Sequence, residues 1–162
     1  MADKYTDGFD NKPSNALFST GKVMKSIVAK MEVAAADANG ATYVLARGLS
    51  LSDIVVGIRI PKGWGAITAG TDYDIGLGFI GNDGQVNAVE ADVFMDSKDM
   101  SSGLTSSLDV CESSTTDTIG EALGTDISTE EAKSNYVIYV TANTVGSTTI
   151  NVDFVIDIAT SA

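Results

Sequence analysis

The carboxylates at positions 72 and 74 are the first side chains in this sequence whose type and spacing could do chemistry. Asp72 and Asp74 stand two residues apart, and in a strand this spacing places both side chains on one face. Such a pair could hydrolyse a glycoside or hold a hard cation. In a half-buried strand the same positions form the wet face, where carboxylates are expected. We therefore interpret the pair as solvent-facing rather than catalytic.

Four further features could bind a ligand or react. Asn82–Gly84 and Asp96–Asp99 offer oxygen ligands for calcium, but neither has the alternating acids and closing Glu of an EF-hand loop. The sole cysteine, Cys111, has acidic neighbours that disfavour a thiolate, so a small buried hydrophobe is the expected role. Trp64, between two glycines, could stack on a sugar, although such a tryptophan more often caps a core.

The composition excludes most enzyme classes. The 162 residues contain no histidine and one cysteine, which removes the usual zinc sites, Ser-His and Cys-His nucleophile pairs, and internal disulfides. Twenty-two acidic against 10 basic residues give a net charge of −12, which disfavours nucleic acid and anionic membranes as partners. We expect no catalytic residue, no cofactor and no metal site. No apolar run approaches the roughly 20 residues of a membrane span, and the polar start lacks a secretory signal.

The elements that position these residues follow an apolar period of two, which is typical of half-buried strands. The pattern predicts strands at 22–33, 41–47, 53–60, 72–80, 135–142 and 148–158. It assigns to the inner face Val23, Ile27, Ala29, Met31 and Val33, then Ile54, Val56, Ile58 and Ile60, and Tyr73, Ile75, Leu77 and Phe79 in the later strand. Residues 143–147 are interpreted as a hairpin loop.

The periodicity weakens between residues 85 and 129, which predicts a loop-rich region. Short elements are expected at 90–95 and 104–110, with a helical turn or two within 119–132. Seven or eight short strands without a long amphipathic helix predict an all-β, antiparallel, jelly-roll-like β-sandwich. This sandwich is expected to form one domain over residues 21–162.

Residues 1–20 are predicted to form an extended N-terminal arm. The arm is polar but carries large apolar side chains that a solvated tail does not need, namely Tyr5, Phe9, Leu17 and Phe18. These four are the candidate partner contacts, with a solvated tail as the alternative. Residues 1–62 carry a net charge of +2 and residues 63–162 carry −14. This division indicates either a solvated acidic surface or an acidic half facing solvent and an arm-bearing half facing a partner.

Several segments together resemble the small β-sandwich virion proteins of tailed bacteriophages, of the head decoration or cement type. The resemblance covers roughly Lys22 to Ile158 and is carried by the strand Asp53–Ile60, the turn Ile58–Gly63, the step Asp74–Gly78, the acidic segment Val89–Met100 and the closing region Tyr136–Ile158. It implies a structural protein on the outer capsid surface, made in the host cytoplasm, that binds the major capsid protein, often as a homotrimer, with an arm along the shell.

Other functions stay open on the sequence alone. A carbohydrate- or receptor-binding module of a phage fibre would use Trp64 and the aspartates of the 72–80 strand. A carboxylate-only enzyme and a shell-forming capsid subunit are two further alternatives.

Overall fold

The computed structural model describes residues 22–61, 72–103, 108–109, 118–123 and 136–161. Its elements are β1 (Lys22–Val33), β2 (Ala41–Leu49), β3 (Ile54–Ile60), β4 (Tyr73–Ile80), β5 (Val86–Lys98), β6 (Leu108–Asp109), α2 (Ile119–Leu123), β7 (Tyr136–Ala142) and β8 (Ile150–Ser161). Within these ranges no helix is long and apolar enough to span a membrane. The predicted arm contacts lie outside the described residues.

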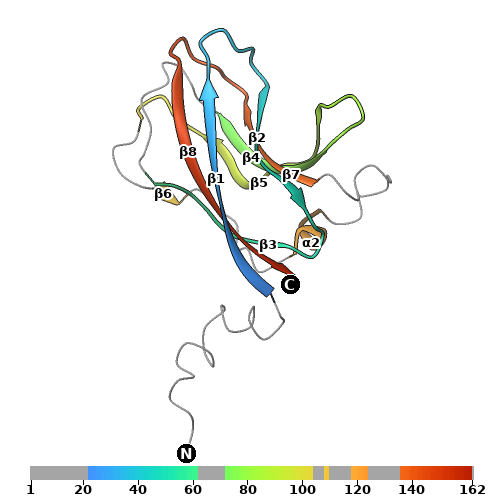
Figure 1. The fold of residues 1–162 in the computed structure, drawn as a ribbon. Coiled ribbons are helices and arrows are strands. Elements are labelled where there is room, and N and C mark those ends of the chain that lie inside the picture. Colours follow the sequence, from blue (N-terminus) through green and yellow to red (C-terminus); the bar gives the residue numbers. More distant parts are fainter. Residues whose placement is uncertain (1–21, 62–71, 104–107, 110–117, 124–135, 162) are drawn as a thin grey trace, which may run out of the picture.

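Two four-stranded antiparallel sheets pack face to face, which confirms the predicted β-sandwich (Figure 1). The strand orders are β1-β8-β3-β6 and β2-β7-β4-β5. In a jelly roll the chain passes from one sheet to the other at most connections, and here β4–β5 is the one consecutive pair that is hydrogen-bonded among the described strands. The hairpin interpretation of residues 143–147 is therefore wrong, because β7 and β8 belong to different sheets.

The ladder between β1 and β8 is the longest in the sandwich. It runs unbroken from Lys22↔Ser161 to Val33↔Ile150. Its inner face buries Ala29, Met31 and Val33 of β1 against alternate residues of β8, as the period of two predicted. The prediction for Val23 is wrong. Its side chain is 53% exposed because β1 begins outside the core and joins it only from Ala29, with Ile27 partly buried.

A bulge in β3 changes which residues face the core. The register shifts between Val55 and Gly57 opposite β8, so one surplus residue reverses the alternation. Val55 and Ile58 enter the core, whereas Val56, predicted to face inward, is 38% exposed. Ile54 is buried but lies outside the core cluster.

The second sheet contributes the aromatic part of the core. Tyr73, Ile75 and Leu77 of β4 are fully buried, as predicted, and Phe79 packs partly against them. The neighbouring strand β7 is buried at nearly every position. The core between the sheets therefore rests chiefly on β8 from one side and on β4 and β7 from the other.

Strand β5 corrects the loop predicted after residue 85. It is 13 residues long, but the three residues Ile75–Leu77 of β4 face the six residues Glu90–Met95 of β5. This surplus breaks the alternation that sequence reading relies on, so the strand was mistaken for a loop with a short element. The surplus chain lies against Gly76. A β-carbon there would stand 2.3 Å from the carbonyl oxygen of Glu90 and 2.4 Å from that of Ala91.

Helix α2 confirms the helical turn predicted near residue 119. Thr118 and Glu121 form a capping box, in which the Thr118 N–H donates to Glu121 Oε2 (2.8 Å) and the Glu121 N–H donates to Thr118 Oγ1 (3.2 Å). The Ile119 N–H donates to the Asp53 carbonyl (2.8 Å). These bonds fix α2 on the turn before β3, where Ile119 and Leu123 are buried.

The close approach at Gly76 generates a prediction. Gly76→Ala should destabilise the protein by more than about 2 kcal/mol, because backbone carbonyls, not flexible side chains, occupy the space. The matched control is Gly57→Ala, where a β-carbon meets nothing within 4 Å and the backbone has ordinary dihedrals. Urea unfolding of both variants measures the difference. Equal midpoints for the two would contradict this description of β5.

Candidate interaction surfaces

The aspartate pair considered for catalysis is part of the scaffold. Asp74 Oδ1 accepts the backbone N–H of Ser97 (2.7 Å), and Asp74 Oδ2 accepts the side-chain amide of Asn143 (2.5 Å). The Asn143 backbone N–H donates to the carbonyl oxygen of Asp72 (3.0 Å). The backbone of Asp72 is in the left-handed region, with a φ of 67°. Both oxygens of Asp74 are thus used to join β5 and the β7–β8 connection to the start of β4.

The candidate calcium ligands also make turns. Asp83 Oδ1 accepts the N–H of Gln85 (3.0 Å), and Asp99 Oδ1 accepts the N–H of Ser101 (2.7 Å). Hydrogen bonds from the Ser101 side chain and, second, from the Ser101 backbone lower the pKa of Asp99. In the part of the chain that the structure describes, no group of three His, Cys, Asp or Glu side chains could hold a metal ion. Trp64 and Cys111 lie outside the described residues.

Positive charge collects on the side of the sandwich formed by β1 and β2. These two strands carry four cations, Lys22, Lys25, Lys30 and Arg47, against the single anion Glu32. Lys25, Lys30 and Arg47 are exposed. Exposed apolar side chains accompany them on β1: Val23 at 53%, Met24 at 41% and Val28 at 69%. This side is therefore both basic and apolar, and we call it the basic edge.

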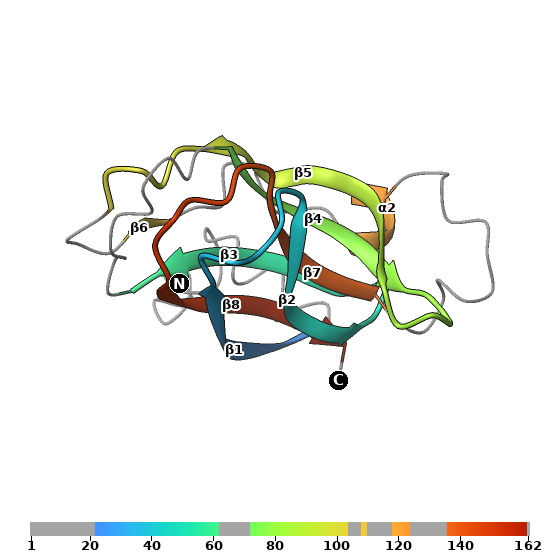
Figure 2. The ribbon, with the colours of Figure 1, turned by 90° about the horizontal axis from the view of Figure 1, so that it is seen from above.

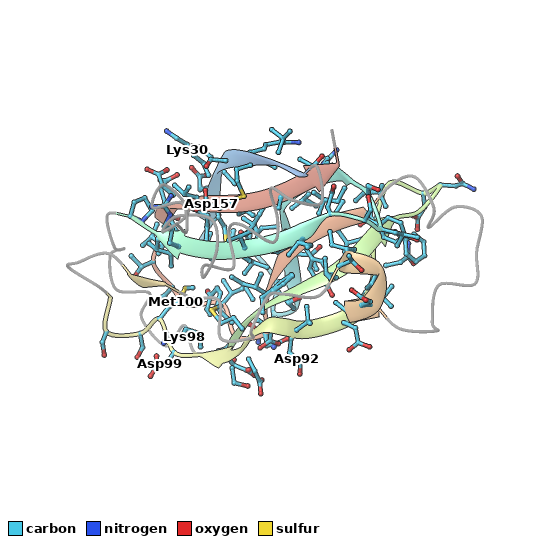
Figure 3. The ribbon with its side chains drawn as sticks, turned by 90° about the horizontal axis from the view of Figure 1, so that it is seen from below. Lys30, Asp92, Lys98, Asp99, Met100 and Asp157 are labelled. Atoms are coloured by element: carbon cyan, nitrogen blue, oxygen red, sulfur yellow. The ribbon has the colours of Figure 1, made fainter. Side chains whose placement is uncertain are left out.

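Negative charge collects on the opposite side. From Asp72 to Asp99, the span of β4 and β5 with its flanking residues, seven acidic residues stand against Lys98 alone. Asp92 and Asp96 of β5 are exposed, and so are the small residues Ala88 and Ala91. We call β5 with these side chains the acidic edge. Figure 2 shows β1 and β5 on opposite sides of the molecule, and Figure 3 shows Lys30 on one side and Asp92 with Asp99 on the other.

Within the described structure neither β1 nor β5 has a second hydrogen-bonded strand beside it, although helix α2 packs against β5. β1 is hydrogen-bonded to β8 alone, and β5 to β4 alone. One ion pair is present among the described residues: Arg59 Nη2 lies 3.0 Å from Asp157 Oδ2, and the hydroxyl of Ser26 bonds the same carboxylate. The charges of the two edges therefore make no ion pair within the described part of the subunit. The division of charge along the chain is visible in the sequence, but the two edges were not predicted from it. A count of the charges on each predicted strand would have suggested them.

The hydroxyl groups of Tyr43 and Tyr139 differ in their hydrogen bonding. The Tyr43 hydroxyl donates to Asp37 Oδ2 (2.6 Å), which also accepts the N–H of Ala34 (2.8 Å). Burial and this bond raise the pKa of Tyr43, and the same bond lowers the pKa of Asp37. Tyr139 is 1% exposed, and its hydroxyl has no partner among the described atoms. Burial, followed by the charges of Asp74, Asp92 and Glu90, raises the pKa of Tyr139 to about 12.

No protein-family model matches this chain, and no curated protein sequence matches it. Among solved structures it is similar to a chain of the acidic stable capsid of Helicobacter pylori bacteriophage KHP30, with 13% identity and a TM-score of 0.45 over 86% of this chain and 90% of that one. It is also similar to a chain of infectious bursal disease virus Gx strain, with 11% identity and a TM-score of 0.43 over 85% of this chain and 33% of that one. The chain thus spans about a third of that second chain.

The two tyrosines generate a prediction about stability. Tyr139→Phe should stabilise the protein by up to about 1 kcal/mol, because it removes a buried hydroxyl without a partner. Tyr43→Phe is the matched control and should destabilise, because it leaves Asp37 without its donor. Urea midpoints at pH 8 measure both effects. Destabilisation by Tyr139→Phe would contradict the placement of that hydroxyl.

A second prediction concerns alkaline pH. The folded pKa of Tyr139, about 12, lies above its ordinary value of 10.0, so stability is fully present below pH 10 and falls as the pH rises towards 12. Tyr139→Phe should reduce this fall without abolishing it, because Tyr43, Tyr73 and Tyr136 also have raised pKa values. Unfolding midpoints between pH 8 and pH 12 test this. An unchanged slope in the variant would be the contrary result.

Proposed function

We propose that this chain is a structural virion protein that decorates the outer surface of a phage head and stabilises it. The observation that carries the proposal is the strand order β1-β8-β3-β6 facing β2-β7-β4-β5. This is the jelly-roll order, an arrangement used by viral capsid proteins, lectins and cupins. A sandwich whose two sheets each end in edge strands suits a subunit that must contact neighbours on several sides.

The chemistry of the described residues favours the capsid role within that group. Cupin-type metal chemistry lacks support, because the chain has no histidine and no described cluster could hold a metal. A sugar site built on Asp72 and Asp74 would need both carboxylates, but both oxygens of Asp74 are bonded to Ser97 and Asn143. The proposed function is therefore non-enzymatic, and the isolated protein should show no hydrolase or transferase turnover.

The proposed attachment has two parts, a domain over residues 21–162 and an arm over residues 1–20. Tyr5, Phe9, Leu17 and Phe18 are the proposed contacts to the major capsid protein. Burying one such side chain contributes about 1.5 to 3 kcal/mol, whereas fixing each backbone residue costs about 1 to 2 kcal/mol. An arm of this length thus binds weakly alone and contributes once the tethered domain is docked. A homotrimer would multiply these weak contacts.

The experiment that tests the function uses phage shells assembled without this chain. Purified full-length protein, made in the host cytoplasm as a soluble product, should cosediment with such shells in a saturable way and raise their melting temperature. Shells that already carry the protein are the control and should take up no more. No binding at micromolar concentrations, or a copy found inside the shell, would contradict the proposal.

The arm has its own prediction. Deleting residues 1–20 should leave the β-sheet circular dichroism unchanged and weaken attachment to shells by at least about tenfold, because the aromatic anchors are lost. The matched control replaces Tyr5, Phe9 and Phe18 with serine in the full chain, which removes the anchors and keeps the arm's length. Attachment as tight as that of the full chain in both variants would overturn this role of the arm.

A further inference from the structure

We infer that copies of this chain join head to tail, with the basic edge of one copy against the acidic edge of the next. The interaction is assigned to β1 on one side and β5 on the other, and its partner is a second copy of this chain. This contact would hold the proposed homotrimer together, and it would form without a phage shell.

Charge complementarity is the first argument. The basic edge carries Lys25 and Lys30 on the two faces of β1, and the acidic edge carries Asp92 and Asp96, all exposed and without ion pairs among the described residues. A chain with a net charge of −12 repels its own copies in most orientations. Placing the one basic side on the most acidic strand replaces that repulsion with attraction, so charge selects this orientation over the others.

The apolar side chains are the second argument. Three of the five exposed large hydrophobic residues in the described structure lie on β1, where an open edge with valines and a methionine is normally a site of association. The opposing strand offers exposed Ala88 and Ala91 between its carboxylates. Small side chains leave room for Val28 and Met24, so the contact can bury apolar area while the charges pair around it.

The two edges are different surfaces of the subunit. β1 and β5 are edge strands of different sheets and lie on opposite sides of the sandwich (Figure 2). A contact between two different surfaces is heterologous, and copies joined in this way form a ring when the rotation closes. Three copies are the fewest that a heterologous contact closes into a ring, as in the proposed homotrimer, whereas a rotation that does not close gives an open filament. A two-fold dimer built on either edge alone would place like charges together.

Charge reversal in the full chain tests the inference. K25E/K30E and D92K/D96K change the net charge in opposite directions, yet each should weaken association at least about tenfold, because each places like charges at the contact. The variant that combines all four changes restores opposite charges and should regain assembly. Sedimentation velocity at pH 7 measures the association, and circular dichroism checks that each variant is folded.

Salt provides a second measurement on the unmodified protein. Raising sodium chloride from 50 mM to 500 mM should weaken the assembly, because screening acts on exposed charges. Three results would each overturn the inference. They are a monomer at high concentration and low salt, a symmetric dimer, and a loss of assembly that the variant with all four substitutions does not restore. Shell cosedimentation of the D92K/D96K variant separates the two proposals. Monomers that still attach to shells leave the decoration function standing without this contact.

Discussion

The continuous pairing of β1 with β8 is the constraint on which the rest of the sandwich depends. Its register runs through all 12 residues of β1 without a bulge. This ladder aligns the inward positions Ala29, Met31 and Val33 with alternate residues of β8, which in turn pairs with β3. A shift of one residue would turn this whole face toward solvent. The ladder therefore sets which side chains form the core and leaves the outer edge of β1 free.

In the second sheet the pairing at the edge is irregular, because the edge strand β5 is longer than its neighbour β4. β5 accommodates the surplus by a bulge against Gly76, where only a residue without a side chain fits. The bulge lies where Asp92 and Ala91 are exposed on the outer edge. The same part of β5 thus both pairs irregularly with β4 and carries an exposed acidic side chain. The edge strands β1 and β5 therefore carry opposite charges.

Sequence reasoning succeeded where the period of two was regular. β4 buries the alternate residues that its pattern predicted, from Tyr73 to Leu77. Sequence reasoning was wrong where a bulge inserted residues, as at Val56 and in β5, because one surplus residue reverses the faces without leaving a compositional mark. The hairpin proposed before β8 was wrong because local turn residues do not reveal which sheet the next strand joins.

The candidate surfaces were predictable only in part. The charge division along the chain was visible, but its concentration on two opposite edges depends on strand order, which pairs β1 with β8 across 117 or more residues. Asp74 was interpreted as a solvent-facing side chain, whereas both of its carboxylate oxygens are bonded to the scaffold. The predicted arm contacts, Tyr5 to Phe18, remain a prediction.

We propose that this jelly roll is a surface subunit of a phage head and that its copies meet through β1 and β5. Electron-microscopy reconstruction of particles assembled from the genome that encodes the chain tests it most directly. The account predicts rings of three sandwiches on the outer shell, with Lys30 of one copy beside Asp92 of the next. Isolated sandwiches, rings in which β1 or β5 faces solvent, or no density for this chain on the shell would contradict it.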